Sequence, residues 1–243
     1  METNQKNDNT CFQQKKYNRI GELLDEFHAT KDVNPEYAHT VIQAACACMN
    51  TRAMLEYSRF LRTTPLLSVS QNARYRTAEK ILLALNNLLD VHVQFSIDVA
   101  LETATLYSEC LHRPVGALGM CLYAKRIGGS VDDQQIRYLQ KKMVDTDINH
   151  LGNNYRDSLL VGQELFRAGS TSRLTELFLR EAKDKSYEAL KHKERGARLV
   201  YAQACLTLGD FYDSQQDTAP FFISERNKLY AEARTYGFPE YLR

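Results

Sequence analysis

The 243-residue chain contains no tryptophan and few residues that break regular structure, with only 5 prolines and 11 glycines. This scarcity excludes collagen-like, mucin-like and proline-rich disordered proteins, which need far more of these residues. Hydrophobic residues make up 44% of the chain and charged residues 25%, as in an ordinary globular protein. The chain is therefore long and apolar enough to bury a sizeable core, in one large domain or two small ones.

The chain also lacks an excess of positive or negative charge, and it has no long apolar run. Lys and Arg number 31 against 30 acidic residues, a formal net charge of +1, so no large field draws the chain toward nucleic acid or an anionic membrane. The longest apolar stretches, such as Ile81–Leu85 and Ile97–Ala100, are far shorter than the roughly 20 residues that a membrane span needs. We expect no membrane span. Residues 1–16 are polar and lack the apolar core of a secretory signal, so we expect a flexible lead-in there.

Sequence motifs for metal binding and catalysis are missing as well. Neither CxxC nor HExxH occurs, and the six histidines are scattered without ligand spacing. Cys46 and Cys48 lie two residues apart, and such residues point about 200° apart on a helix, which keeps their thiols from meeting one ion. No converging set of nucleophile, base and metal ligands stands out. We therefore expect no cofactor, no metal and no small-molecule substrate.

The cysteines are Cys11, Cys46, Cys48, Cys110, Cys121 and Cys205. Most of them lie among Ala, Leu and Met, where a free thiol behaves as a small hydrophobic residue. We expect buried free thiols, and hence an intracellular, reducing compartment.

Apolar residues recur at helical spacing along almost the whole chain, which predicts an all-α protein. Short breaks between the helical stretches are typical of antiparallel helical hairpins. The expected helices cover Tyr17–Ala29, Pro35–Met49, Arg52–Arg62, Asn72–Asp90, Phe95–Leu111, Val115–Ile127, Asp132–Val144, Tyr155–Ala168, Thr171–Lys183, Lys193–Tyr212 and Phe221–Tyr236.

Turn signals lie at several of these boundaries. Asn34 followed by Pro35 is typical of a helix cap and the first helical position. Gly128 and Gly129 indicate a glycine stop; the alternative, a phosphate-binding loop, lacks the preceding strand and the Gly-Lys-Ser/Thr ending of such loops. Within Tyr155–Lys183, we expect the two helices to pack through Leu159, Leu165, Phe166, Leu174 and Phe178.

Three stretches resemble pentatricopeptide repeats. Tyr155–Leu160, continuing through Leu165–Gly169 to Leu174–Ala182, resembles one such repeat, with an aromatic opening, an aliphatic pair, a glycine turn and a Leu/Phe seam. Pro35–Ile42 resembles the opening of the first helix of a repeat, and Ala117–Asp132 resembles its second helix and exit.

The C-terminal pair of helices is instead similar to a tetratricopeptide repeat with a lengthened turn. The matching residues are Leu208, Gly209, Tyr212, Tyr230, Ala233 and Pro239. The turns of the recognisable units follow one another at unequal intervals, all longer than the roughly 34 residues of an ideal array. The resemblance implies an irregular α-solenoid of antiparallel helical hairpins, a divergent array with inserted helices that forms a single helical-repeat domain over residues 17–243.

Resemblance to pentatricopeptide arrays implies single-stranded RNA binding in an organelle, where each repeat reads one base. The positions that would read a base are usually Asn, Ser or Thr in that family, whereas His39 and Asp157 occupy them here. A carboxylate there repels phosphates, and a net charge of +1 supplies little attraction to them. RNA is therefore a disfavoured partner.

One segment combines aromatic and arginine residues, which are enriched at protein interfaces and also stack on bases. This candidate protein-binding patch comprises Tyr57, Arg59, Phe60, Arg62, Arg74, Tyr75 and Arg76. The favoured hypothesis is a non-catalytic adaptor or subunit that binds another protein within a multi-subunit assembly, in the cytoplasm or the mitochondrial matrix. The alternatives are a pentatricopeptide-like RNA-binding protein and an all-α enzyme without a recognisable motif.

Overall fold

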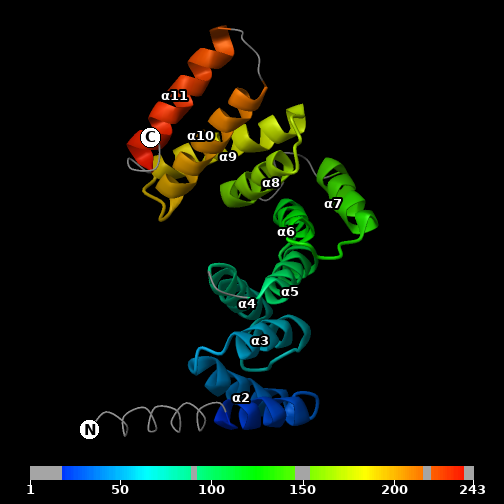
Figure 1. Ribbon diagram of the computed structural model, residues 1–243. Coiled ribbons are helices and arrows are strands. Elements are labelled where there is room, and N and C mark those ends of the chain that lie inside the picture. Colours follow the sequence, from blue (N-terminus) through cyan, green and yellow to red (C-terminus); the bar gives the residue numbers. More distant parts are fainter. Residues whose placement is uncertain (1–17, 89–91, 146–153, 216–219, 238–243) are drawn as a thin grey trace, which may run out of the picture. The chain divides into compact units, whose positions relative to one another are not determined.

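The computed structural model describes residues 18–88, 92–145, 154–215 and 220–237 (Figure 1). Every regular element among these residues is helical, which confirms the all-α prediction. The expected lead-in over residues 1–16 lies outside the described residues. The chain divides into two compact units, Met1–Phe95 and Ser96–Arg243.

The described helices of the first unit are a helix over residues 18–30, α2 (Pro35–Ala47), α3 (Thr51–Thr63) and α4 (Gln71–Asn86). Helix α5 (Val93–Thr105) begins just before the boundary. It is followed in the second unit by the π-helical turn η1 (Leu106–Cys110), α6 (Pro114–Arg126), α7 (Asp133–Asp145), α8 (Tyr155–Arg167), α9 (Arg173–Lys191), α10 (Ala197–Ser214) and α11 (Pro220–Tyr236).

Short polar side chains cap several of these helices at their N-termini. Asn34 Oδ1 accepts a hydrogen bond from the Tyr37 amide at 3.2 Å, and Asn50 Oδ1 accepts one from the Ala53 amide at 2.9 Å. Such caps satisfy backbone donors that have no partner within the helix. At the end of α6, Gly128 adopts a φ of 98°, the left-handed conformation that the glycine stop requires.

In the first unit, α3 packs against both α2 and α4. Phe27 from the preceding helix meets Phe60 of α3 edge to face, with ring centroids 5.3 Å apart. Ile42 of α2 and Leu82 of α4 are fully buried. The core of this unit is therefore built from one apolar face of each helix.

In the second unit, consecutive helices pack as hairpins: α6 with α7, α8 with α9, and α10 with α11. Helix α8 also contacts α6, and α9 contacts α10. A glycine at the centre of a helix allows close approach at two of these contacts. A β-carbon added at Gly162 would lie 2.7 Å from Leu179 Cδ2, and one added at Gly209 would lie 2.7 Å from Tyr230 Cε1.

The structure corrects two details of the sequence prediction. Phe178 and Leu159 are buried as expected, but Leu174 is 48% exposed, and Leu179 and Ala182 take the inward positions instead. The expected helix Phe95–Leu111 does not stay α-helical to its end. It finishes in the π turn η1, where the Leu111 amide donates to the Leu106 carbonyl, five residues back, at 3.0 Å.

Candidate functional site

Two of the three aromatic members of the predicted patch belong to the core of the first unit. Tyr57 and Phe60 are buried. The Tyr57 hydroxyl lies 2.8 Å from His39 Nε2 and accepts a hydrogen bond from Gln43 Nε2 at 3.1 Å. Neither ring is available to a partner, because both lie on the inward face of α3.

Arg74 is buried as well, and it fastens α4 to the end of α3. Its Nη1 donates to the Leu61 carbonyl at 3.0 Å and to the Thr64 carbonyl. These carbonyls lie at the C-terminal end of α3, where a cation is favourable to the helix dipole. The remaining members, Arg59, Arg62, Tyr75 and Arg76, are at least partly exposed. The seven residues therefore do not form one surface.

The two positions matched to base-reading residues have internal partners. His39 contacts Tyr57, and burial lowers the pKa of its imidazole against the opposing effect of Glu36. Asp157 is buried and accepts two hydrogen bonds from Arg113, at 2.9 Å from Nε and 2.7 Å from Nη2. Both side chains stabilise packing within their own unit.

A large hollow lies in the second unit, along the exposed face of α9. It has a volume of about 640 Å³ and is lined by Tyr155, Asp184, Lys185, Tyr187, Glu188, Ala189 and Glu194. A second hollow of about 280 Å³ adjoins it and is lined by Lys183, Asp184, Tyr187, Tyr201, Glu232 and Tyr236. The two share Asp184 and Tyr187. We call them together the α9 groove, and the smaller one the tyrosine hollow.

Three aromatic rings from three helices follow one another in the tyrosine hollow. Tyr187 of α9 lies with its ring centroid 5.2 Å from that of Tyr201 of α10, at an interplanar angle of 37°. Tyr201 in turn meets Tyr236 of α11 at 5.1 Å and 87°. Offset and edge-to-face contacts of this kind stabilise aromatic pairs beyond the area they bury.

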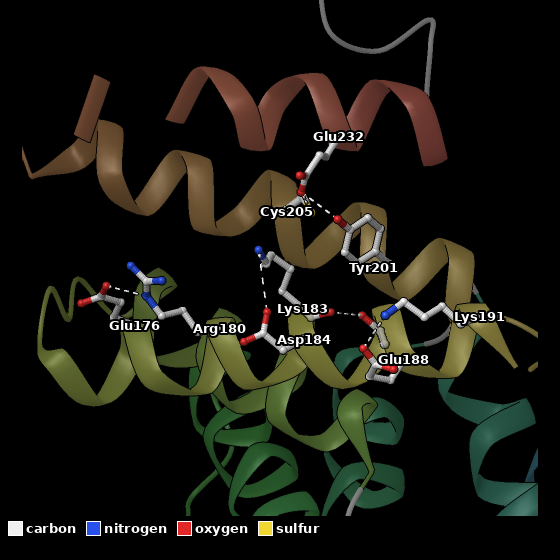
Figure 2. Close-up of polar contacts among 10 residues, drawn as sticks. Glu176, Arg180, Lys183, Asp184, Glu188, Lys191, Tyr201, Cys205 and Glu232 are labelled. Carbon is white, nitrogen blue, oxygen red and sulfur yellow. Dashed lines mark hydrogen bonds and ion pairs between the residues drawn. The ribbon is translucent and has the colours of Figure 1, made fainter. Parts of the chain in front are cut away.

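Glu232 reaches from α11 to two side chains of α10 (Figure 2). Its Oε2 accepts hydrogen bonds from the Tyr201 hydroxyl at 2.7 Å and from Cys205 Sγ at 3.5 Å. Burial and this carboxylate raise the pKa of Cys205 to about 12, and they also raise the pKa of Tyr201. Both groups therefore keep their protons at neutral pH and act as hydrogen-bond donors.

Charged side chains surround the rings of the groove. Lys191 Nζ lies 4.6 Å from the centre of the Tyr187 ring and 2.8 Å from Glu188 Oε1. Lys183 Nζ lies between α9 and α10, 3.7 Å from Asp184 Oδ1 (Figure 2). The surface is thus a mixture of tyrosine rings with ammonium and carboxylate groups.

The groove offers recognition chemistry more readily than covalent chemistry. Its nearest thiol, Cys205, is buried and protonated, and thiols are nucleophilic only as thiolates. Within the described ranges, no group of three or more His, Cys, Asp or Glu side chains is arranged to hold a metal ion. No helix among these residues is both long and apolar enough to cross a membrane.

Comparison with known proteins returned no similarity: no family profile, curated protein sequence or solved structure matches the chain.

The sequence alone did not single out the α9 groove. Its tyrosines, Tyr155, Tyr187, Tyr201 and Tyr236, come from four different helices. Only the packing of α8, α9, α10 and α11 brings them to one surface. The signal in the sequence was the abundance of tyrosine, 14 residues, without any indication of which of them share a face.

Proposed function

We propose that the protein is a non-catalytic helical-repeat adaptor and that it binds a protein partner through the α9 groove. The observation that carries this proposal is the tyrosine lining of the groove. Tyrosine supplies a large apolar ring with a polar tip and is enriched at the residues that dominate binding energies. Tyr187 is 38% exposed although its ring already contacts Tyr201, so it retains area for a partner to cover.

The arrangement of charges supports a macromolecular partner. Exposed charges such as Asp184, Glu188 and Lys191 border the rings. Apolar centres with polar, solvated rims are characteristic of protein interfaces. Hairpins α8–α9 and α10–α11 hold the rings on rigid elements, so little order has to be gained on binding.

The repeat family and the compartment are part of the same proposal and rest on the sequence. The likeness to pentatricopeptide and tetratricopeptide repeats supports an irregular solenoid and a role in a multi-subunit assembly, in the cytoplasm or the mitochondrial matrix. Contacts of α8 with α6, α9 and α10 are compatible with such an array.

Affinity purification of the tagged full chain, with mass spectrometry and with or without nuclease, tests the proposal. Tyr187→Ala should reduce recovery of a stoichiometric protein partner by about fivefold or more, because truncation of a central interface aromatic costs over about 1 kcal/mol. Tyr138→Ala is the matched control: this tyrosine lies on α7, 59% exposed and outside the groove.

Equal loss of the partner in both variants would contradict the role of the groove. Loss of every partner on nuclease treatment would instead favour the RNA-binding alternative. Turnover of a substrate by the purified chain would favour an enzyme.

A further inference from the structure

We propose that the tyrosine hollow takes the ammonium group of a lysine side chain from the protein partner. This inference rests on the proposed function, and it names the chemistry by which the partner is recognised.

The walls of the hollow suit a cation. The rings of Tyr201 and Tyr236 stand nearly perpendicular, at 87°, and Tyr187 adds a third ring tilted by 37° to Tyr201. These rings pack against one another, and Tyr187, 38% exposed, is the one with most surface left open at the hollow. The face of an aromatic ring carries negative electrostatic potential and attracts an ammonium ion. A volume of about 280 Å³ accommodates the end of one side chain.

The charge of the lining is complementary to one additional cation. Two carboxylates, Asp184 and Glu232, and one ammonium, Lys183, line the hollow, which leaves one formal negative charge. Asp184 is exposed at the mouth, with 73% of its side chain accessible. Glu232 belongs to α11 and lines the hollow across from Asp184 of α9. Its Oε2 accepts the hydrogen bonds from both Tyr201 and Cys205. A lysine that enters the hollow therefore meets a carboxylate on either side.

The chain already binds one of its own lysines in this manner at the edge of the hollow. Lys191 Nζ lies 4.6 Å over the Tyr187 ring and 2.8 Å from Glu188 Oε1. A ring and a carboxylate thus hold an ammonium group together, the same pair of partners that the hollow offers.

Lys183 is the internal competitor of the incoming lysine. Its ammonium lies within the lining of the hollow, 3.7 Å from Asp184 Oδ1, which is a long separation for an ion pair (Figure 2). Replacing Lys183 by a neutral residue changes the formal charge of the lining from one to two negative charges. A cationic ligand should then bind more tightly, whereas an anionic ligand such as RNA should bind more weakly.

Fluorescence anisotropy with the full chain and a fluorescein-labelled tetralysine peptide at low ionic strength tests the inference. Glu232→Gln should weaken binding by about fivefold, since glutamine still accepts a hydrogen bond from Tyr201 but removes the charge. Lys183→Met should strengthen binding by about threefold. Glu225→Gln is the matched control, the same change on the same helix outside the hollow, and it should alter affinity by less than about twofold.

The inference would be overturned by no saturable binding of tetralysine, by equal binding of its fully acetylated form, or by weaker binding to the Lys183→Met variant. Equal effects of Glu225→Gln and Glu232→Gln would do the same, because they would show attraction by charge anywhere on α11. A different result would contradict the proposed function. If a partner is lost with Tyr187→Ala while tetralysine does not bind, the adaptor role stands and only the lysine assignment falls.

Discussion

Phe178 anchors α9 in the core that it shares with Leu118 of α6 and Val161 of α8. Truncation to alanine removes a buried ring and leaves a cavity, so Phe178→Ala should lower the free energy of unfolding by about 3–5 kcal/mol. Urea denaturation followed by circular dichroism measures this. Leu177→Ala, next in the chain but 52% exposed, should change the value by less than about 1 kcal/mol. A loss below about 1 kcal/mol for Phe178→Ala would mean that the inward face of α9 was assigned wrongly.

The expected burial of the thiols holds for Cys121 and Cys205, whereas Cys46, Cys48 and Cys110 are only half-buried. A thiol of each kind, Cys121 and Cys46, makes the free energy of unfolding depend on pH in the alkaline range. Burial raises the pKa of Cys121 to about 11 and that of Cys46 to about 12, from an ordinary value of 9.0. Below pH 9 the thiols are protonated in both states, so their contribution is fully present. Above it, the unfolded chain releases protons that the folded chain keeps, and the free energy of unfolding falls as pH rises toward the folded pKa values.

We therefore expect the melting temperature to decrease from about pH 9 to about pH 11. Cys121→Ala should make this decrease shallower, since it removes one of the groups with a raised pKa. Thermal unfolding across this pH range measures the slope for both proteins. An identical slope in wild type and variant would show that Cys121 does not titrate as its burial implies.

At the scale of the helix, the Arg113–Asp157 ion pair joins the start of α6 to α8. Arg113→Met leaves the Asp157 carboxylate buried without this partner, which should cost about 3–5 kcal/mol of unfolding free energy. Adding Asp157→Leu should restore part of the loss, because the uncompensated charge is then removed as well. Denaturation of both single variants and the double variant gives the coupling. Lys125→Met, at an exposed pair with Asp133, is the control and should leave stability nearly unchanged.

Helix boundaries were the most predictable feature of the chain, because local chemistry decides them. Asn34 and Gly128 mark ends that the structure confirms to within a few residues. Helix α9 continues past the expected end at Lys183 to Lys191, since its charged stretch has no breaker until the turn before Gly196. Such a stretch reads equally well as an exposed helix or as a loop.

The buried face of each helix was harder to predict, because it depends on which other helices pack against that helix in the fold. Arg74 looked like a surface residue, yet the free carbonyls at the end of α3 give its guanidinium buried partners. Leu174 looked like core, yet the turn of α9 places it outward. The α9 groove could not be predicted from the sequence for the same reason, because Tyr155 and Tyr236 come to one surface only through the packing of four helices.

At the scale of the whole molecule, the balance of 31 basic and 30 acidic residues predicts weak binding of nucleic acid. Mixed-sequence single-stranded RNA at moderate salt should bind with a Kd weaker than about 1 μM in fluorescence anisotropy. Reversing Arg59, Arg62 and Arg76 to Glu should leave the helical circular dichroism spectrum intact, because these side chains are at least partly exposed, whereas Arg74 has to be spared.

Tighter binding of RNA that weakens as salt rises, with a slope near −0.7 for each neutralised phosphate, would contradict this prediction. It would then favour the pentatricopeptide-like alternative over the adaptor.

The number of residues in the π turn η1 sets the orientation of the helices that follow it. A π turn is equivalent to an α-helix with one residue inserted, and the helix accommodates the extra residue by widening. Deleting one residue there would let α5 continue regularly, but it would rotate everything beyond by about 100°. The Arg113 guanidinium now lies 4.1 Å over the Tyr107 ring while it binds Asp157 of α8. The number of residues in this turn, more than their identity, is therefore what brings that arginine onto α8.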